Sequence, residues 1–325
     1  MQTRQLGPLQ VSAIGLGCMG MTPIYGTPDP ALAIATIHRA ADLGVTLLDT
    51  SDAYGKGENE RLVARAIAGR RDRYVVSTKF GNLRNPDGSP GVNGRPEYVR
   101  QACEASLKRL GIDTIDLYFQ HRVDTTVPVE DTVGAMSRLV EAGKVRHIGL
   151  SEAAAPRIRR AHATHPLAAL QTEYALATRE VETGILDTCE ELGIGFVAYG
   201  ALGRGLLTGT IQNDTTLAPD DIRLQMPRFQ DENREKNLKL VARLQELAAH
   251  ERCTPSQLAI AWVLSRRDFI VPIIGTSKPQ RLEEDAAAAD LRISAETLVA
   301  LDEAFPPGAA AGVRTMPELL PRLGL

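Results

Sequence analysis

Short apolar runs alternate with longer amphipathic stretches along most of the chain. The apolar runs are typical of buried strands in a parallel sheet, and the stretches between them repeat apolar residues at helical spacing. The sequence therefore predicts a succession of βα units. The predicted strands cover residues 14–17, 46–49, 74–79, 115–120, 147–151, 168–172, 195–199 and 269–274.

The predicted helices cover residues 29–43, 58–68, 95–110, 128–142, 154–165, 180–192, 254–266 and 278–289. Four of them end at a glycine that suits the left-handed position after a helix, namely Gly44, Gly111, Gly143 and Gly193. Eight βα units favour a closed (β/α)8 TIM barrel over an open sheet, because closure removes the sheet edges.

Several segments exceed the minimal barrel. Residues 3–6 and 9–12 flank Gly7-Pro8 and predict a small hairpin that closes the bottom of the barrel. Long loops at 81–94 and 200–230, a helix at 234–250 and a tail after Phe305 complete the chain. Loops of this length are usually functional or disordered. No linker divides the chain, so residues 1–325 are expected to form one domain.

Composition narrows the classes of partner and location. A net charge of -3 gives no reason to expect nucleic acid or an anionic membrane as a partner. No apolar run approaches the ~20 residues of a membrane span, and the first residues lack a signal-peptide core. The four cysteines are scattered without metal-ligand spacing. A cytoplasmic protein with reduced thiols and no metal site is the expectation.

The segment GLGCMG at 15–20 matches the dinucleotide-binding pattern GxGxxG. A Rossmann turn needs a helix that begins within the glycines and an acidic residue about 20 positions later. Here MTPIYGTPDP follows, and the first acidic residue that ends a strand, Asp49, comes about ten positions too late. The pattern therefore does not indicate a Rossmann domain.

Polar side chains end consecutive predicted strands. Asp49, Lys79 and His121 follow three neighbouring strands, and Tyr54 lies in the loop after Asp49. Each has an ordinary explanation alone, as a turn cap, a surface lysine, a hydrogen-bonded histidine or a packed loop tyrosine. Active sites of such barrels lie at the carboxyl ends of the strands, so their joint placement predicts one catalytic site.

These residues sit in segments that resemble the aldo-keto reductases. The segments are LDTSDAYG, VVSTKFG, DLYFQHRVD, GKVRHIGLSE, ALQTEY, AYGALGRGLLTG and VPIIGTSKPQRLEED, in family order from about residue 3 to 305. LGCMGM and GLSEA are most similar to the branch of perakine reductase and pyridoxal reductase. The resemblance implies a (β/α)8 barrel that binds a nicotinamide cofactor without a Rossmann fold. It also implies that the backbone of Gly17, Cys18 and Met19 lines the cofactor pocket.

The resemblance assigns the four polar residues to carbonyl reduction, and elementary chemistry agrees. Tyr54 is expected to give a proton to the carbonyl oxygen while the cofactor supplies a hydride. The ordinary tyrosine pKa of ~10 is high for this role, and a neighbouring Lys79 lowers it. Asp49 would neutralise and orient Lys79, and neutral His121 would orient the carbonyl.

The same resemblance places further residues around the nicotinamide. Ser151, Glu152 and Gln171 are expected at the carboxamide, and Tyr199 on the ring. The family pattern at the first two of these positions is Ser-Asn, whereas this chain has Ser151-Glu152. The glycine loop after Tyr199 is expected at the pyrophosphate, since its exposed amides suit an anion, although a merely flexible loop stays an alternative. The loop residues are Gly200, Ala201, Leu202, Gly203, Arg204 and Gly205.

The start of the last predicted helix suits a phosphate, because helix N-termini favour anions. Lys278 and Arg281 would bind the 2′-phosphate of NADP(H), so NADPH is expected over NADH, unless both are solvated surface charges. Asp285 replaces the usual Asn at the adenine and brings a negative charge. The expected contacts at this end are Gly275, Thr276, Ser277, Lys278, Arg281, Glu284 and Asp285.

The expected partner is a small-molecule carbonyl substrate of unspecified identity. The loops at 81–94 and 200–230 and the tail should wall its pocket. The aromatic candidates are Tyr25, Tyr54, Phe80, Phe119 and Phe229. Arg84, Arg122 and Arg228 could meet a polar or anionic substrate, but they are interpreted as surface residues.

Two other functions remain open. One is a nicotinamide-binding regulatory subunit with little turnover, as in the potassium-channel β-subunits of the same family, although no docking extension is visible. The other is a metal-dependent hydrolase using Asp49 and His121, but such sites generally want more histidines or carboxylates. The sequence gives no indication of oligomeric state.

Overall fold

Eight parallel strands form a closed barrel in the computed structural model, which describes residues 1–85 and 87–324. The strand order around the barrel is β10-β11-β12-β3-β4-β5-β8-β9. Closure pairs the last strand with the first, with Ile274 opposite Leu16 and Gly275 opposite Gly17. The strands are β3 (Gly15–Gly17), β4 (Leu47–Asp49), β5 (Val75–Phe80), β8 (Ile115–Gln120), β9 (Val145–Ser151), β10 (Ala169–Glu173), β11 (Gly195–Tyr199) and β12 (Ile270–Gly275).

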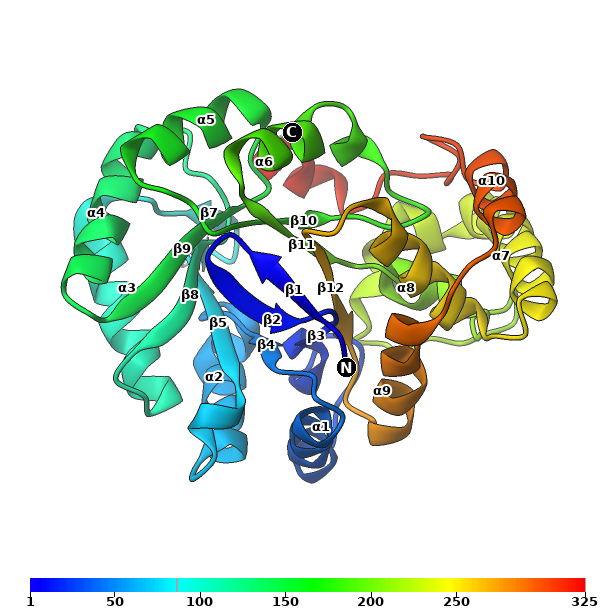
Figure 1. The fold of residues 1–325 in the computed structure, drawn as a ribbon, viewed down its shortest axis with the longest axis horizontal. Helices are drawn as coiled ribbons and strands as arrows, with labels where there is room; N and C mark the ends of the chain where they lie inside the picture. The colour runs from blue at the N-terminus through cyan, green and yellow to red at the C-terminus, as the bar shows by residue number, and fades with distance from the viewer. Residues whose placement is uncertain (86, 325) are drawn as a thin grey trace.

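Helices surround the barrel, and α7 and α10 lie together at one side of the molecule (Figure 1). Within the described ranges, none of them is both long and apolar enough to cross a membrane. The helices are α1 (Pro30–Asp42), α2 (Glu58–Ile67), α3 (Pro96–Leu110), α4 (Val129–Glu141), α5 (Ala155–Thr164), α6 (Ile185–Leu192), α7 (Asp231–His250), α8 (Pro255–Arg266), α9 (Pro279–Ala286) and α10 (Ala295–Ala304).

The structure confirms the predicted barrel and moves several boundaries. The helix predicted over 180–192 is wrong at its start, because Gly184 adopts a φ of 87° and separates a short 3₁₀ turn from α6. The helix predicted over 278–289 ends its α-helical part at Ala286 and continues as a 3₁₀ turn. The loop at 81–94 contains a hairpin of β6 (Asn82–Arg84) and β7 (Pro90–Val92). Between the 3₁₀ turn after Ala286 and the tail lies α10, which was not predicted.

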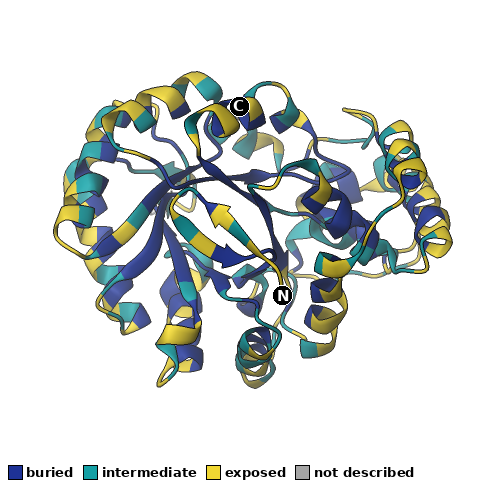
Figure 2. Cartoon of the chain, viewed as in Figure 1, coloured by how far each residue is buried: buried dark blue, intermediate teal, exposed yellow. Residues whose placement is uncertain are grey.

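Alternation along the strands separates the interior of the barrel from the layer between strands and helices, because successive strand residues point to opposite faces. One buried cluster near the bottom joins Leu47, Leu117, Phe119, Val197 and Val271. Two residues after Leu47, Phe119 and Val197 come the mouth residues Asp49, His121 and Tyr199. Figure 2 shows the barrel strands mostly buried, with most exposed residues on the surrounding helices and loops. The barrel is thus a largely apolar core with a group of polar side chains at its carboxyl end.

The predicted N-terminal hairpin is present as β1 (Thr3–Leu6) and β2 (Leu9–Ser12), and it lies across the bottom of the barrel (Figure 1). Leu6 belongs to the interior cluster and is fully buried. Gly195 makes this approach possible, since a Cβ there would stand 2.3 Å from the Leu6 Cα. Arg4 fastens the hairpin by donating to the carbonyls of Leu264, Arg267 and Ile270 at 2.6 to 2.8 Å.

Candidate active site

Lys79 lies at the centre of the barrel mouth and is completely buried. Its Nζ donates to Asp49 Oδ1 at 2.5 Å, to the Thr50 carbonyl at 2.8 Å and to the Tyr54 hydroxyl at 3.3 Å. Burial lowers the Lys79 pKa, but the Asp49 and Tyr54 charges outweigh it, so the pKa lies above its ordinary value. Lys79 is therefore a fixed ammonium beside Tyr54, and the structure brings together three of the predicted catalytic residues.

The carboxylate of Asp49 is held on both oxygens. Oδ2 accepts from Ser77 Oγ at 2.8 Å and from Gln171 Nε2 at 2.9 Å, while Oδ1 faces Lys79. Gln171 thus orients Asp49 across the barrel. A buried ion pair is stable only when its remaining donors and acceptors are satisfied, and here they are.

His121 is the fourth predicted catalytic residue and lies beside Tyr54. The two ring centroids are 5.7 Å apart and the ring planes are nearly perpendicular. The His121 Nδ1 is 3.0 Å from the Ser51 hydroxyl. Burial, with the charges of Arg122, Lys79 and Arg322, holds the His121 pKa well below its ordinary value. The imidazole is neutral, as the sequence predicted.

The pKa of Tyr54 differs from the sequence-based expectation. Burial raises it, and the neighbouring Lys79 ammonium lowers it by less, so the pKa lies above the usual value of ~10. Lys79 acts in the expected direction, but desolvation of the phenolate is the larger effect. Tyr54 therefore keeps its proton at neutral pH and has a proton to give.

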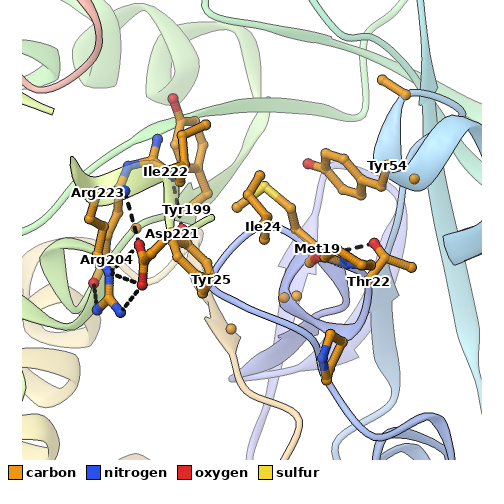
Figure 3. A pocket seen from close by; sticks show the side chains of 18 of the residues that line it. Met19, Thr22, Ile24, Tyr25, Tyr54, Tyr199, Arg204, Asp221, Ile222 and Arg223 are labelled. Atoms are coloured by element: carbon orange, nitrogen blue, oxygen red, sulfur yellow. Dashed lines mark hydrogen bonds and ion pairs between the residues drawn. The ribbon is translucent and has the colours of Figure 1, made fainter. Parts of the chain in front are cut away.

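A cavity of about 1720 Å³ opens at the barrel mouth. Figure 3 shows the Tyr54 hydroxyl pointing into it, with Met19 and Ile24 between Tyr54 and Tyr199. All three segments expected as walls line it: the β6–β7 hairpin, the excursion at 200–230 and the tail. Among the aromatic candidates, Tyr25 and Tyr54 line the cavity, whereas Phe80, Phe119 and Phe229 are buried elsewhere.

Most residues expected at the cofactor lie along this cavity, but a few do not. Cys18, Ser151, Glu152 and Gly203 are buried behind the lining. The expected contacts that line the cavity are Gly17, Met19, Asp49, Gln171, Tyr199, Gly200, Ala201, Leu202, Arg204, Gly205, Gly275, Thr276, Ser277, Lys278, Arg281, Glu284 and Asp285. The lining thus runs from the catalytic residues to the start of α9.

Glu152 faces a buried arginine rather than open space. Arg314 from the tail donates to Glu152 Oε1 at 3.0 Å and to Oε2 at 2.5 Å. The Tyr199 hydroxyl donates to Oε1 as well, at 2.8 Å. Burial raises the Glu152 pKa, but Arg314 outweighs burial and holds that pKa below its ordinary value. The expected hydrogen bond from Glu152 to a carboxamide would have to compete with these donors.

The loop after Tyr199 contains three consecutive residues with positive φ, a backbone conformation that favours glycine. Gly203, Arg204 and Gly205 have φ of 56°, 58° and 93°, and such consecutive turns expose amides to an anion. The Arg204 Nη1 donates to the Tyr25 hydroxyl at 3.2 Å. Arg223, paired with Asp221, lies over the Tyr25 ring (Figure 3). Two segments distant in sequence therefore meet above the cavity.

The start of α9 forms the far end of the cavity. Lys278 and Arg281 both line it, and the Lys278 amide donates to the Thr276 hydroxyl at 3.1 Å. Asp285 is buried beside them. Burial and the charge of Glu284 raise the Asp285 pKa to about 7, although Arg281 lowers it. The carboxyl of Asp285 is therefore partly neutral at physiological pH.

The interpretation of Arg84, Arg122 and Arg228 as surface residues is correct only for Arg84. Arg228 is buried and faces Glu173 at 3.6 Å. Arg122 is half-buried and lines the cavity beside His121. Both are enclosed because the excursion at 200–230 and the tail fold over the mouth, which local sequence does not show.

Three residues that contribute to the site were not predicted. Ser51 and Ser77 lie within the segments already singled out, and the alternation from Ser77 to Lys79 places both side chains inside the barrel. That pattern was available in the sequence. Arg314 lies far along the chain from its partners and has no local signal. Among residues 1–85 and 87–324, no group of three or more His, Cys, Asp or Glu side chains could hold a metal ion.

The chain resembles known proteins over nearly its whole length. Residues 13–305 match the model of the "Aldo/keto reductase family". The solved glycerol dehydrogenase AKR11B4 from Gluconobacter oxydans is 31% identical, with 94% of this chain and 96% of that chain covered and a TM-score of 0.86. The holo form of aldo-keto reductase AKR11C1 from Bacillus halodurans is 25% identical, with 96% and 98% covered and a TM-score of 0.79.

Proposed function

Because the chain belongs to the aldo/keto reductase family of oxidoreductases, which carry out NAD(P)H-dependent carbonyl reduction, we propose that it uses NADPH to reduce an aldehyde or ketone to the alcohol. The observation that carries the proposal is the contact of buried Lys79 with both Asp49 and the Tyr54 hydroxyl. An ammonium fixed beside a phenol that opens into a cavity suits proton delivery to a carbonyl oxygen.

Tyr54 acts as the general acid. Its hydroxyl gives a proton to the oxygen as that oxygen gains negative charge, and the Lys79 ammonium stabilises the phenolate that is left. Asp49 holds Lys79 in place and balances its charge, and Ser77 and Gln171 hold Asp49. Asp49 and Lys79 need not reorganise during the transfer, since each is fixed by several hydrogen bonds.

His121 orients the carbonyl. When the Ser51 hydroxyl donates to Nδ1, the Nε2 carries the hydrogen and is a donor beside Tyr54. The neutral imidazole adds a directed hydrogen bond without a second positive charge against Lys79. Two donors then converge on one oxygen, which is the arrangement that an oxyanion needs.

The cavity and its lining fit a nicotinamide dinucleotide. A bound cofactor supplies the hydride. Gln171 and Tyr199 would border the nicotinamide, and the amides of the loop at 200–205 would hold the pyrophosphate. Lys278 and Arg281 would hold the 2′-phosphate. The fit rests on the left-handed backbone at Arg204 and Gly205 and on Lys278 and Arg281, which have no ion pair among the residues that the structure describes.

Replacing Lys278 and Arg281 together by Ala should weaken NADPH binding by at least roughly tenfold, because two charge-assisted contacts to a phosphate are lost. NADH, which lacks that phosphate, should lose much less. Fluorescence titration of both cofactors measures the effect. The exposed Arg100→Ala on α3 is the control for a change in net charge. Equal weakening of NADPH and NADH would show that the phosphate is held elsewhere.

Asp285 should make NADPH affinity depend on pH. As pH rises through about 7, its carboxyl ionises near the proposed phosphate site and repels the phosphate. NADPH affinity relative to NADH should therefore fall between pH 6 and 8.5 in the wild type, a range set around that pKa. Asp285→Asn should show a smaller fall, and measuring both proteins cancels the titration of the phosphate itself. Identical pH profiles would contradict this role.

The proposed function is tested by oxidation of NADPH in the presence of a carbonyl panel that includes nitrobenzaldehyde and glyceraldehyde. Carbonyl-dependent oxidation supports it. Glycerol with NADP⁺ belongs in the same panel, because a related solved structure is named a glycerol dehydrogenase. Cofactor binding without turnover of any compound would contradict a reductase and favour the regulatory alternative.

We also propose that the chain acts as one domain over residues 1–325. Within the family we favour the perakine reductase and pyridoxal reductase branch, supported by LGCMGM and GLSEA. The cytoplasmic location stays a prediction from the sequence.

A further inference from the structure

Arg122 places a positive charge at the edge of the catalytic residues. It follows His121 directly at the end of β8 and lines the cavity. Its Nη1 donates to the His121 carbonyl at 2.7 Å and to the Ser151 hydroxyl at 3.3 Å. These bonds fix the guanidinium on the rim and occupy one terminal nitrogen. The remaining N–H groups are free to meet a ligand, since the guanidinium has five.

Arg322 reaches the same wall from the other end of the chain. It ends the 3₁₀ segment Pro317–Arg322, lines the cavity and donates to the Gly91 carbonyl of β7. The tail is held at the mouth, because the Gly324 amide donates to the Glu152 carbonyl at 2.9 Å. The charges of Arg122 and Arg322 both lower the pKa of His121, and Arg122 lowers that of Arg322 after burial does. The hydrogen bonds agree, because Arg122 donates to Ser151 while Gly324, two residues after Arg322, donates to the adjacent Glu152. Both arginines therefore reach the cavity at the ends of β8 and β9, beside His121.

No carboxylate within the described chain lies within 4.0 Å of either guanidinium. Glu318 also lines the cavity but is exposed and beyond that distance. Three other arginines of the cavity lining are paired, Arg109 with Glu60, Arg204 with Glu173 and Arg223 with Asp221. Arg84, which is exposed, and Arg281 at the start of α9 have no ion pair within the described residues. Glu152 lies near enough for the charge of Arg122 to lower its pKa, but its oxygens are bound by Arg314 and Tyr199. Two half-buried cations of like sign with no described carboxylate within 4.0 Å favour a ligand that supplies a negative charge.

We propose that Arg122 and Arg322 form an anion subsite, and that the preferred substrate is a carbonyl compound bearing a carboxylate or a phosphate ester. The inference rests on the proposed reductase function. The phosphate of the cofactor does not account for the pair. Lys278 and Arg281 follow β12, whereas Arg122 follows β8, four strands away on the opposite side of the eight-stranded barrel.

The test compares substrates matched in carbonyl reactivity. The pairs are 4-formylbenzoate with its methyl ester, and glyceraldehyde 3-phosphate with glyceraldehyde. The value of kcat/KM for the anionic member should exceed that of the neutral member by roughly tenfold or more, the size expected for charge-assisted hydrogen bonds. A preference for 4-formylbenzoate over its methyl ester identifies a carboxylate ligand. A preference for glyceraldehyde 3-phosphate over glyceraldehyde identifies a phosphate ligand.

Variants assign any preference to the two arginines. Arg322→Gln and Arg122→Gln should each lower the ratio of anionic to neutral kcat/KM by roughly tenfold. Arg322→Lys should retain part of it, because the charge remains without the forked geometry. Arg100→Gln removes the same charge from exposed α3 and should leave the ratio at the wild-type value. A ratio that falls equally in Arg100→Gln would overturn the subsite.

The results distinguish failure of the anion subsite from failure of the reductase function. If the neutral aldehydes react and the anionic ones gain nothing, the subsite is wrong and the reductase function stands. If neither reacts, the reductase function fails, and binding decides the subsite. Benzoate should then bind the protein with NADP⁺ at least tenfold more tightly than benzamide by calorimetry, and Arg322→Gln should remove the difference. Equal binding of benzoate and benzamide would overturn it.

Discussion

Tyr54→Phe is expected to lower kcat/KM for carbonyl reduction by about 10²–10⁴-fold, the range for loss of a general acid. The change removes only the hydroxyl, which opens into the cavity and contacts Lys79 at 3.3 Å. Since that hydroxyl acts mainly in the transition state, the Kd for NADPH should change by less than about threefold. Single-turnover oxidation of NADPH and a separate cofactor titration measure the two effects.

Tyr74→Phe is the matched control for the loss of one tyrosine hydroxyl. Tyr74 donates to the Ile37 carbonyl at 3.1 Å outside the barrel mouth, so its loss should cost only about 0.5–1.5 kcal/mol of stability. Its reduction rate should equal that of the wild type. A rate for Tyr54→Phe within threefold of this control, or an equal loss of NADPH binding, would remove Tyr54 from the role of acid.

Arg314→Ala is expected to destabilise the fold by about 3–5 kcal/mol, because Glu152 is left buried without its partner. In a chain of this size the corresponding fall in Tm is on the order of 10 °C. Arg314 also faces Glu173 at 3.6 Å, so two buried carboxylates lose a counter-charge. Equilibrium denaturation in urea measures the free energy of unfolding. The exposed Arg292→Ala should change it by less than about 0.5 kcal/mol.

The pH dependence of this loss identifies its cause. In the wild type the Glu152 pKa is held low, so the pair stabilises the fold above the unfolded pKa of ~4.3 and less as pH falls below it. Without Arg314, burial raises the Glu152 pKa, and protonation then relieves the unpaired charge. The deficit of Arg314→Ala should therefore be larger at pH 7 than at pH 5. Glu152→Gln added to Arg314→Ala should recover part of the stability at pH 7, and no recovery would assign the loss to packing alone.

The sequence was sufficient wherever function follows the period of a strand. Alternation and strand ends placed Asp49, Lys79 and His121 on one mouth, and the structure joins Asp49 and Lys79 directly. It was insufficient where distant segments meet. Arg122 was interpreted as a surface residue because the tail that encloses it comes roughly 200 positions later. The predicted start of the helix over 180–192 was wrong because Gly184 is left-handed and interrupts the helix.

The net pKa of Tyr54 was also beyond the sequence. The direction in which Lys79 acts follows from charge alone, but its balance against desolvation depends on how completely the loop is enclosed. The spacing of residues in the sequence predicts which side chains are neighbours, whereas the burial of the Tyr54 side chain depends on the whole fold.

The N-terminal hairpin has a consequence for the order in which the protein folds. Its Arg4 donates to carbonyls 260 to 266 positions later, and its Leu6 packs over Gly195. The hairpin therefore gains these partners only when the segment up to β12 has folded, and contacts of such long sequence separation form slowly. The bottom of the barrel is thus completed late in folding, on the side opposite to the catalytic residues.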